Sequence, residues 1–112
     1  MDVWHNPRCG KSRQCITYLK ENNYEFNTIL YLNEPISKDR LIEIVHVLGI
    51  RPIDLVRKNE PIFKEQFKNK SLSDEACIDM MIAHPKLIER PIVITEKGAA
   101  IGRPLENIKS IL

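Results

Sequence analysis

The residues with the clearest capacity for chemistry lie near the N-terminus, in the run His5–Arg13, which reads HNPRCGKSR. Cys9 stands between a short apolar strand candidate and a helix candidate. The first backbone amides of a helix have no partner within the helix, and the helix dipole favours an anion at that end. A helix start and nearby cations also lower the pKa of a cysteine. We therefore expect Cys9 to be a reactive thiolate, or to lie beside a bound oxyanion.

The neighbours of Cys9 are expected to support this state. Gly10 would let a ligand approach the backbone closely. Ser12 would either cap the helix or hydrogen-bond the thiolate, and Asn6 belongs to the turn that precedes the cysteine. The alternative is that Cys9 is a small buried apolar residue. Four potentially cationic residues within four positions argue against that alternative: His5, Arg8, Lys11 and Arg13.

The other two cysteines are expected to be structural. Along a helix, Cys15 would lie about 9 Å beyond Cys9 at 1.5 Å per residue, whereas a disulfide needs Cα atoms within about 7 Å. Cys77 shares a predicted helical face with Met80 and Met81. An odd cysteine count without a CxxC pair argues against a disulfide framework and a zinc site, and favours a reducing compartment. A resolving thiol for Cys9 would then come from another molecule.

Three arginines are candidates for binding an oxyanion. Arg90 and Arg103 each precede a proline and bracket a predicted hairpin, and a residue before proline is biased towards an extended conformation. Arg57 follows a predicted short helical turn. Arginine binds oxyanions bidentately, which lysine does not do. The alternative for each arginine is a solvated surface position, and the sequence leaves open whether Pro91 is cis.

Length and composition restrict the class of protein. The chain of 112 residues is 43% hydrophobic and 29% charged, which is typical of one soluble domain. A net charge of +2, with basic residues spread along the chain, does not indicate nucleic-acid binding. No apolar stretch approaches the roughly 18 residues of a membrane span, and the N-terminus has no signal-peptide core. We expect a cytoplasmic protein without a membrane segment.

Hydrophobic periodicity predicts an α/β fold. A strand over 2–5, a helix over 12–22 and a strand over 24–31 form a βαβ unit with parallel strands. A helical insert follows at about 37–83, with helices that begin at Ser37 and Ser73.

The C-terminal part is predicted to return to the sheet. Residues 91–95 and 99–101 form a hairpin. A last helix opens at Pro104 and turns three side chains inward: Leu105, Ile108 and Leu112.

Four motifs in order resemble those of the glutaredoxin-dependent arsenate reductase family. The first is His5–Arg13, and the others are Leu55–Pro61, His84–Val93 and Ile101–Pro104. The resemblance runs in register from residue 2 to the C-terminus. It implies a thioredoxin-like fold in a single domain over 1–112, with a mixed four-stranded sheet flanked by helices and a helical insert.

The resemblance also implies roles for individual residues. Cys9 corresponds to the nucleophile, and His5 to a residue that lowers its pKa. Arg57, Arg90 and Arg103 correspond to the arginines that hold the arsenic oxyanion. The family reduces arsenate to arsenite with glutathione as co-substrate and glutaredoxin as partner, and without a bound cofactor or metal.

Two other readings of the sequence remain open. One is a glutathione-linked thiol–disulfide oxidoreductase with another substrate, and the other is an Spx-type regulator that docks on a larger protein such as RNA polymerase. Spx-type proteins usually carry a CxxC pair, but Ser12 stands at the fourth position here. Cys15 stands where the Cys-x5-Arg loop of phosphatase-like arsenate reductases has arginine. Lys11 departs from a threonine common in the family, and its effect on anion choice stays open.

Overall fold

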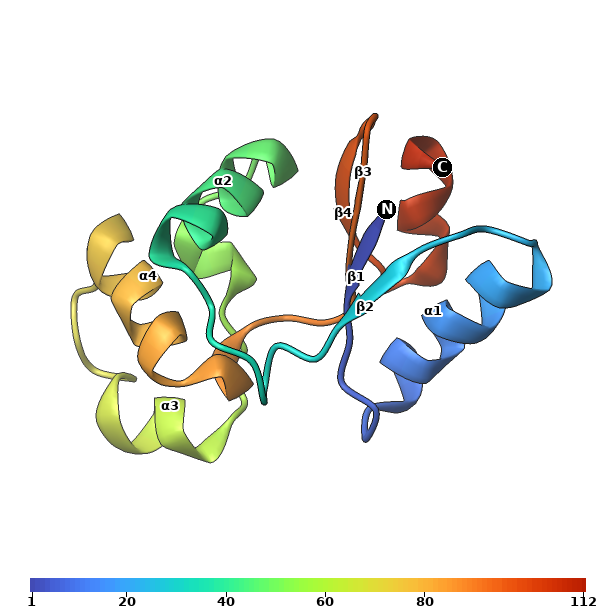
Figure 1. The fold of residues 1–112 in the computed structure, drawn as a ribbon. Coiled ribbons are helices and arrows are strands. Elements are labelled where there is room, and N and C mark those ends of the chain that lie inside the picture. Colours follow the sequence, from blue (N-terminus) through green and yellow to red (C-terminus); the bar gives the residue numbers. More distant parts are fainter. The chain divides into compact units, whose positions relative to one another are not determined.

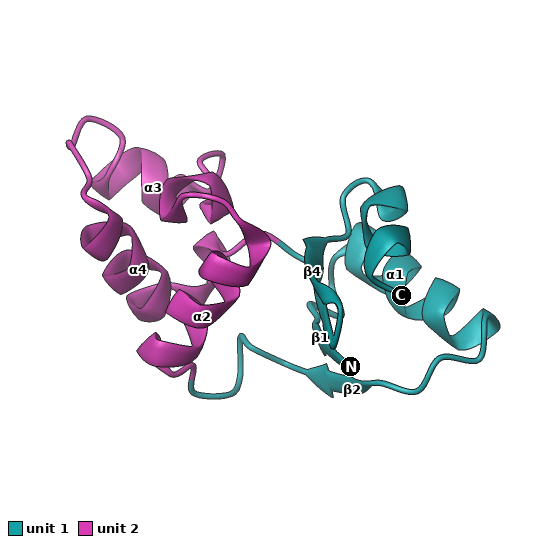
Figure 2. Ribbon diagram, turned by 90° about the horizontal axis from the view of Figure 1, so that it is seen from above, with its two compact units in different colours: residues 1–35, 90–112 teal, residues 36–89 magenta.

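The chain folds into two compact units. The computed structural model describes all residues from 1 to 112. Unit 1 comprises Met1–Pro35 and Arg90–Leu112, and unit 2 comprises Ile36–Glu89. Figure 1 shows the fold, and Figure 2 shows unit 1 in teal and unit 2 in magenta.

A mixed four-stranded sheet is the framework of unit 1. Its strands are β1 (Asp2–Trp4), β2 (Asn27–Ile29), β3 (Ile92–Thr95) and β4 (Gly98–Ile101), in the spatial order β2-β1-β3-β4. β1 pairs in parallel with β2 and antiparallel with β3, and β3 and β4 form an antiparallel hairpin. The parallel βαβ unit and the C-terminal hairpin are therefore confirmed, and so is the expected fold class.

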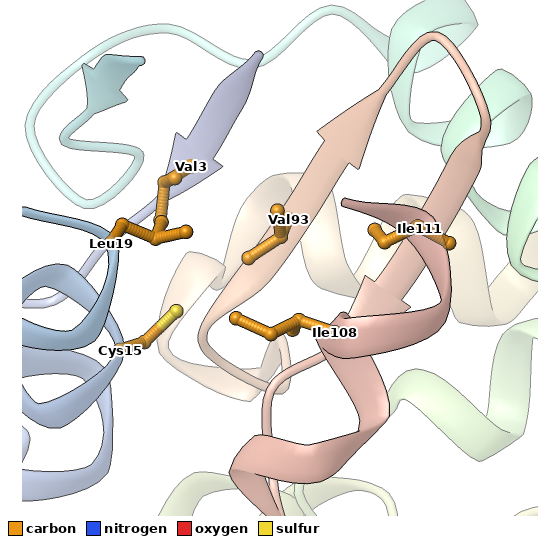
Figure 3. Packing of buried hydrophobic residues seen from close by; sticks show 6 residues of the cluster. All are labelled: Val3, Cys15, Leu19, Val93, Ile108 and Ile111. Atoms are coloured by element: carbon orange, nitrogen blue, oxygen red, sulfur yellow. The ribbon is translucent and has the colours of Figure 1, made fainter. Parts of the chain in front are cut away.

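Two helices flank the sheet of unit 1. α1 (Gly10–Glu21) connects the parallel strands, and the 3₁₀ helix η3 (Leu105–Ile111) follows the hairpin. Figure 3 shows side chains from α1, β1, β3 and η3 pointing towards one another in a single apolar cluster. The six buried members of this cluster are Val3, Cys15, Leu19, Val93, Ile108 and Ile111. The cluster fixes α1 through Cys15 and Leu19, and Cys9 is the N-cap residue of this helix.

The second strand is shorter than the sequence predicts. Residues 24–31 were expected to be extended, but only Asn27–Ile29 pair with β1. The chain is still turning at the start of this segment, because Asn23 has a φ of 61° and the Tyr24 amide donates to the Leu19 carbonyl at 3.0 Å. At the other end, the Leu30 carbonyl accepts from Asn33 and closes a turn.

The last helix also differs from its prediction. It is a 3₁₀ helix, which has three residues per turn. Residues 105, 108 and 111 therefore share a face, so Ile111 joins the buried cluster and Leu112 is only half-buried. Leu105 and Leu112 are partly buried and pack against the same cluster, so the expected inward positions of Leu105, Ile108 and Leu112 are confirmed, and Ile111 is an additional buried member.

Unit 2 consists of helices and turns. Its elements are α2 (Lys38–Leu48), η1 (Pro52–Leu55), α3 (Pro61–Gln66), α4 (Asp74–Ala83) and η2 (Pro85–Leu87). The predicted caps are confirmed, since the Ser37 and Ser73 side chains accept hydrogen bonds from the amides of Arg40 and Ala76. α4 packs against α2, η1 and η2. None of the helices combines the length and apolar composition needed to cross a lipid bilayer.

Candidate active site

Cys9 is the N-cap residue of α1. Its backbone is extended, with φ −96° and ψ 123°, and its carbonyl accepts the first helical hydrogen bond from Arg13 at 3.0 Å. A tight turn precedes it, because the Cys9 amide donates to the Asn6 carbonyl at 3.0 Å and the Asn6 side chain accepts from the Arg8 amide. The thiol is half-exposed. The turn therefore presents the sulfur at the start of the helix, where amides have no helical partner.

The pKa of Cys9 is lowered. Burial of the thiol raises its pKa, but this is outweighed by hydrogen bonds from the backbone amide of Ser12, from the Arg90 side chain and from the amide of Lys11, together with the charge of Arg90. The helix amides thus act on the sulfur as predicted. A lowered pKa increases the thiolate fraction near neutral pH, and the thiolate is the nucleophilic form of cysteine.

The pKa of His5 is lowered, which disfavours the protonated form that could stabilise the thiolate, and the role of His5 towards Cys9 stays a prediction. Burial lowers its pKa, and the positive charges of Arg13 and Lys20 lower it further, so the ring favours the neutral form. Its Nδ1 lies 2.6 Å from the hydroxyl of Ser12, which also accepts a hydrogen bond from the Asn6 amide at 3.0 Å. His5 therefore contacts Ser12 and orders the helix start whose amide donates to the sulfur.

Ser12 takes neither of the roles proposed for its side chain. It is fully buried, and it is not the helix cap, because that position belongs to Cys9. Its hydroxyl binds His5 and the turn, while its backbone amide binds the thiolate. The side chain of Ser12 points into the protein because α1 begins at Gly10, which places residue 12 on the buried face of the helix.

Two of the three predicted arginines reach the thiol. Arg90 hydrogen-bonds Cys9, and a guanidinium nitrogen of Arg103, Nη1, lies 4.0 Å from its sulfur. They bracket the β3–β4 hairpin, and each precedes a cis proline, Pro91 or Pro104. Arg103 is exposed and Arg90 is half-buried. The site therefore combines a thiolate with two guanidinium groups supplied by the opposite end of the chain.

Other residues of the loop stabilise its shape. Nη1 of Arg13 donates to the Pro7 carbonyl at 3.0 Å. A Cβ added at Gly10 would meet Nη2 of Arg13 only at 3.8 Å, which is ordinary contact. The protein itself does not require glycine there, so the role of Gly10 in admitting a ligand stays a prediction.

Gly102 is a residue whose importance the sequence analysis missed. Its amide donates to the Pro91 carbonyl at 2.8 Å, and an added Cβ would lie 2.9 Å from the Pro91 ring and 3.6 Å from the sulfur of Cys15. The close approach holds the segment before Arg103 against the segment after Arg90. In the sequence, the only indication that Gly102 matters is its position next to Arg103. Nothing in the sequence indicates that Gly102 contacts Pro91.

Arg57 belongs to unit 2 and is held there by two carboxylates. Its Nε donates to Glu60 at 3.2 Å, and its Nη1 lies 3.9 Å from Glu89. Its amide donates to the Leu87 carbonyl at 2.7 Å, beside an isolated β-bridge between Val56 and Ile88. The side chain is 18% exposed. The role of Arg57 in holding an oxyanion stays a prediction.

The remaining cysteines are structural, as predicted. Burial raises the pKa of Cys15 to about 11, and its side chain belongs to the apolar cluster of unit 1. Burial and the charge of Asp74 raise the pKa of Cys77, which lies on α4. All three cysteines are free thiols. No group of three or more His, Cys, Asp or Glu side chains is arranged to hold a metal ion.

Comparisons with known proteins agree with this arrangement. The model of the ArsC family matches residues 4–111. The chain is 42% identical to the uncharacterized protein YfgD of Escherichia coli strain K12, over 98% of this chain and 94% of that protein. It is 37% identical to an arsenate reductase of Neisseria meningitidis, over 98% of this chain and 96% of that protein. A solved structure of an arsenate reductase from Vibrio cholerae matches with a TM-score of 0.91 and 37% identity, over 100% of this chain and 98% of that chain.

Proposed function

The chain belongs to the ArsC family, and from this premise we propose that it is an arsenate reductase with Cys9 as its nucleophile. The observation that carries the proposal is the lowered pKa of Cys9 beside two guanidinium groups. A thiolate alone would suit many thiol reactions. Arginines that reach the same sulfur suit a small tetrahedral oxyanion, because they offset the charge on its oxygens.

In the first step, the Cys9 sulfur attacks the arsenic of arsenate. A sulfur–arsenic bond forms, and one arsenate oxygen takes up protons and leaves as water. No change of oxidation state occurs in this step. Arg90 and Arg103 hold the remaining oxygens, while the amides of Ser12 and Lys11 keep the sulfur deprotonated before the attack.

In the second step, the thiolate of glutathione attacks the Cys9 sulfur. A disulfide between Cys9 and glutathione forms, and the electron pair of the sulfur–arsenic bond stays on arsenic, which leaves as arsenite. Two thiol sulfurs are oxidised while As(V) is reduced to As(III), so the reaction balances with thiols alone and involves no bound cofactor. A glutaredoxin thiol then removes the glutathione and restores Cys9.

An external second thiol follows from the surroundings of Cys15. Its pKa is raised to about 11 and it is buried among apolar side chains, so it is a poor attacking thiol. Glutathione is therefore proposed as co-substrate and glutaredoxin as partner. Both require a reducing compartment, and the proposal accordingly places the protein in the cytoplasm.

Arg57 is included in the proposal through the family resemblance. Its guanidinium is fixed by Glu60 and Glu89, and these pairs restrict its conformations before any ligand binds. A restricted guanidinium loses less entropy when it binds an oxyanion. Arg57→Leu should raise KM for arsenate, while Arg57→Lys should restore only part of the affinity, because lysine binds an oxyanion as a point charge.

Coupled turnover tests the proposal directly. The purified protein is mixed with arsenate, glutathione and glutaredoxin, and arsenite formation is measured. We expect turnover that requires all three reagents, and much slower turnover when thioredoxin replaces glutaredoxin. Absence of arsenite with every thiol donor, from protein whose Cys9 still alkylates rapidly, would overturn the proposal.

Arsenate protection separates this function from general thiol–disulfide exchange. If the arginines hold an oxyanion beside the sulfur, arsenate should slow alkylation of Cys9 by iodoacetamide, whereas nitrate at the same ionic strength should not. The Arg90→Leu variant should lose the protection. A protein that reduces a glutathionylated peptide quickly and shows no arsenate protection would instead be an oxidoreductase of another substrate.

A further inference from the structure

Unit 2 contains a pocket whose charged lining residues are all basic, which we call the basic pocket. Its volume is about 650 Å³, and ligand pockets usually have volumes of about 300–1,000 Å³. No acidic residue lines it. Its five cationic residues are Arg51, Lys58, Lys64, Lys68 and Lys70. The basic residues are spread along the sequence, but the fold gathers these five around one pocket.

The lysines of the basic pocket have no acidic partners. Arg51 pairs with Asp74 at 3.4 Å, whereas the four lysines form no ion pair in the structure. All four are exposed. By contrast, Lys38 of α2 pairs with both Glu75 and Asp79. Unpaired like charges around one concavity repel one another and create a positive potential that an anion would relieve.

The floor of the basic pocket is apolar and fixed by packing. Phe63 is only 7% exposed, and its ring lies 6.4 Å from that of Phe67. The Phe67 ring also contacts His84, and Lys70 Nζ lies 5.6 Å from its centroid. Ile53 and Leu72 complete the apolar lining. The lining therefore complements a ligand that carries both an apolar group and several negative charges.

A second pocket of unit 2 shows that this charge pattern is not general. It has a volume of about 440 Å³ and lies between α2 and α4. Its charged lining residues have both signs: Lys38, Asp74 and Glu75. Its lysine is already neutralised by carboxylates. Of these two pockets, the basic pocket alone combines an apolar floor with a rim of one sign.

We propose that the basic pocket binds an acidic segment of a partner protein. Several carboxylates of that segment contact the rim lysines, and one apolar side chain packs on Phe63 and Phe67. Lysines are flexible point charges, so four of them around a rim suit several separate carboxylates better than one phosphate. Each exposed charge pair contributes little, so affinity must come from several pairs together with an apolar anchor.

Binding of a short synthetic peptide to the full-length protein tests this proposal. The labelled peptide has four glutamates around a central leucine and phenylalanine, and binding is followed by fluorescence anisotropy. We expect saturable binding that weakens between ~50 mM and ~300 mM salt, since exposed charge pairs are screened. Peptides with glutamine in place of glutamate, or serine in place of both apolar residues, should each bind at least about tenfold more weakly.

Matched charge variants locate the site. Lys64→Gln/Lys68→Gln should weaken binding about tenfold, whereas Lys86→Gln/Lys109→Gln, which removes two exposed lysines elsewhere, should change it less than about twofold. Equal losses in the two double variants would overturn the proposal, because binding would then depend on net charge alone. Tighter binding of ATP or single-stranded DNA than of the peptide, lost in Lys64→Gln/Lys68→Gln, would overturn it in favour of a phosphate ligand.

Peptide binding to the basic pocket is expected to be independent of arsenate reduction. The rim and the floor belong to unit 2, whereas the reacting sulfur belongs to unit 1. Cys9→Ser should therefore bind the peptide as the wild-type protein does. Loss of peptide binding in Cys9→Ser would overturn the placement of the site in the basic pocket.

Discussion

Cys9 and Cys15 lie six positions apart on the same helix segment, yet their thiols have opposite properties. Cys9 caps the N-terminus of α1, where amides of Ser12 and Lys11 donate to its sulfur and its pKa is lowered. Cys15 lies two turns further on, in the apolar cluster, and burial raises its pKa to about 11. The difference shows that thiol reactivity in this protein depends on access to unpaired amides and guanidinium groups rather than on membership of the helix.

The surroundings of the two cysteines also differ in the kind of residue that forms them. Cys15 is surrounded by apolar contacts that define the fold. Gly102 lies so close that a Cβ added to it would be 3.6 Å from the sulfur of Cys15. The surroundings of Cys9 are polar groups from both ends of the chain, at the loop of residues 6–13 and at Arg90 and Arg103. A substitution at Cys9 should therefore change the chemistry of the protein, whereas a substitution at Cys15 should change its stability.

The largest expected difference is in turnover. Cys9→Ser should abolish arsenite formation, because a serine hydroxyl is not ionised near neutral pH and cannot form the disulfide through which two thiols supply electrons to arsenic. Cys15→Ser and Cys77→Ser should retain most of the activity. Arsenite formation with glutathione and glutaredoxin is measured for the three variants at equal concentrations of folded protein. An inactive but folded Cys15→Ser would mean that the second thiol is internal.

The next difference is in alkylation rate and its dependence on pH. At pH 8 a thiol of pKa about 11 is roughly 0.1% thiolate, whereas an ordinary cysteine is roughly a tenth or more, and the lowered pKa of Cys9 raises its thiolate fraction further. Cys9 should therefore react with iodoacetamide at least about a hundredfold faster than Cys15. Because the thiolate is the deprotonated form, the rate should rise with pH, and the midpoint for Cys9 should fall below that of an ordinary cysteine because its pKa is lowered.

Mass spectrometry of the alkylated peptides assigns each rate to its cysteine. The control is protein unfolded in denaturant, in which the three cysteines should react at similar rates. Equal rates for Cys9 and Cys15 in the folded protein would show that the two thiols do not differ in reactivity.

Arg90→Leu should lower the reactivity of Cys9 less than Cys9→Ser does. It removes a hydrogen bond and a positive charge from the sulfur, so the pKa of Cys9 should rise. It also removes a group that offsets oxyanion charge, and we expect kcat/KM for arsenate to fall about ten- to hundredfold. Arg90→Lys should restore the charge but not the bidentate geometry, and thus recover the pKa more fully than the turnover. Unchanged alkylation in Arg90→Leu would contradict the assignment.

Much of this arrangement could be predicted from local sequence. The caps Ser37 and Ser73 and the hairpin follow from side-chain type and periodicity, because they depend on contacts between residues close in the chain. The parallel pair joins residues 25 positions apart, and it follows from the order of strand, helix and strand. The position of Cys9 at a helix start follows from the same kind of argument. Its lowered pKa was expected for the same reason, since the first helical amides are unpaired whatever the remaining fold.

Other features of the structure depend on information beyond local sequence. The protonation of His5 depends on its burial and on the charges of Arg13 and Lys20, neither of which is evident from its neighbours. The burial of Ile111 in η3 follows from a period of three residues per turn, which the α-helical period assumed for this segment did not include. The contact of Gly102 with Pro91 joins two segments of the chain, and a glycine in a sequence does not indicate which surface approaches it.

The smallest expected effects are on stability, and here the two cysteines should exchange roles. Cys15→Ser places a hydroxyl among Leu19, Val93 and Ile108, where burial without a partner costs about 1–3 kcal/mol in the free energy of unfolding. Cys9→Ser should be neutral or slightly stabilising, because serine is a preferred N-cap residue and residue 9 already has the extended backbone of that position. Urea unfolding of the reduced proteins measures both. If Cys9→Ser were the more destabilised variant, the thiol of Cys9 would contribute to the fold, and the division between a chemical and a structural cysteine would not hold.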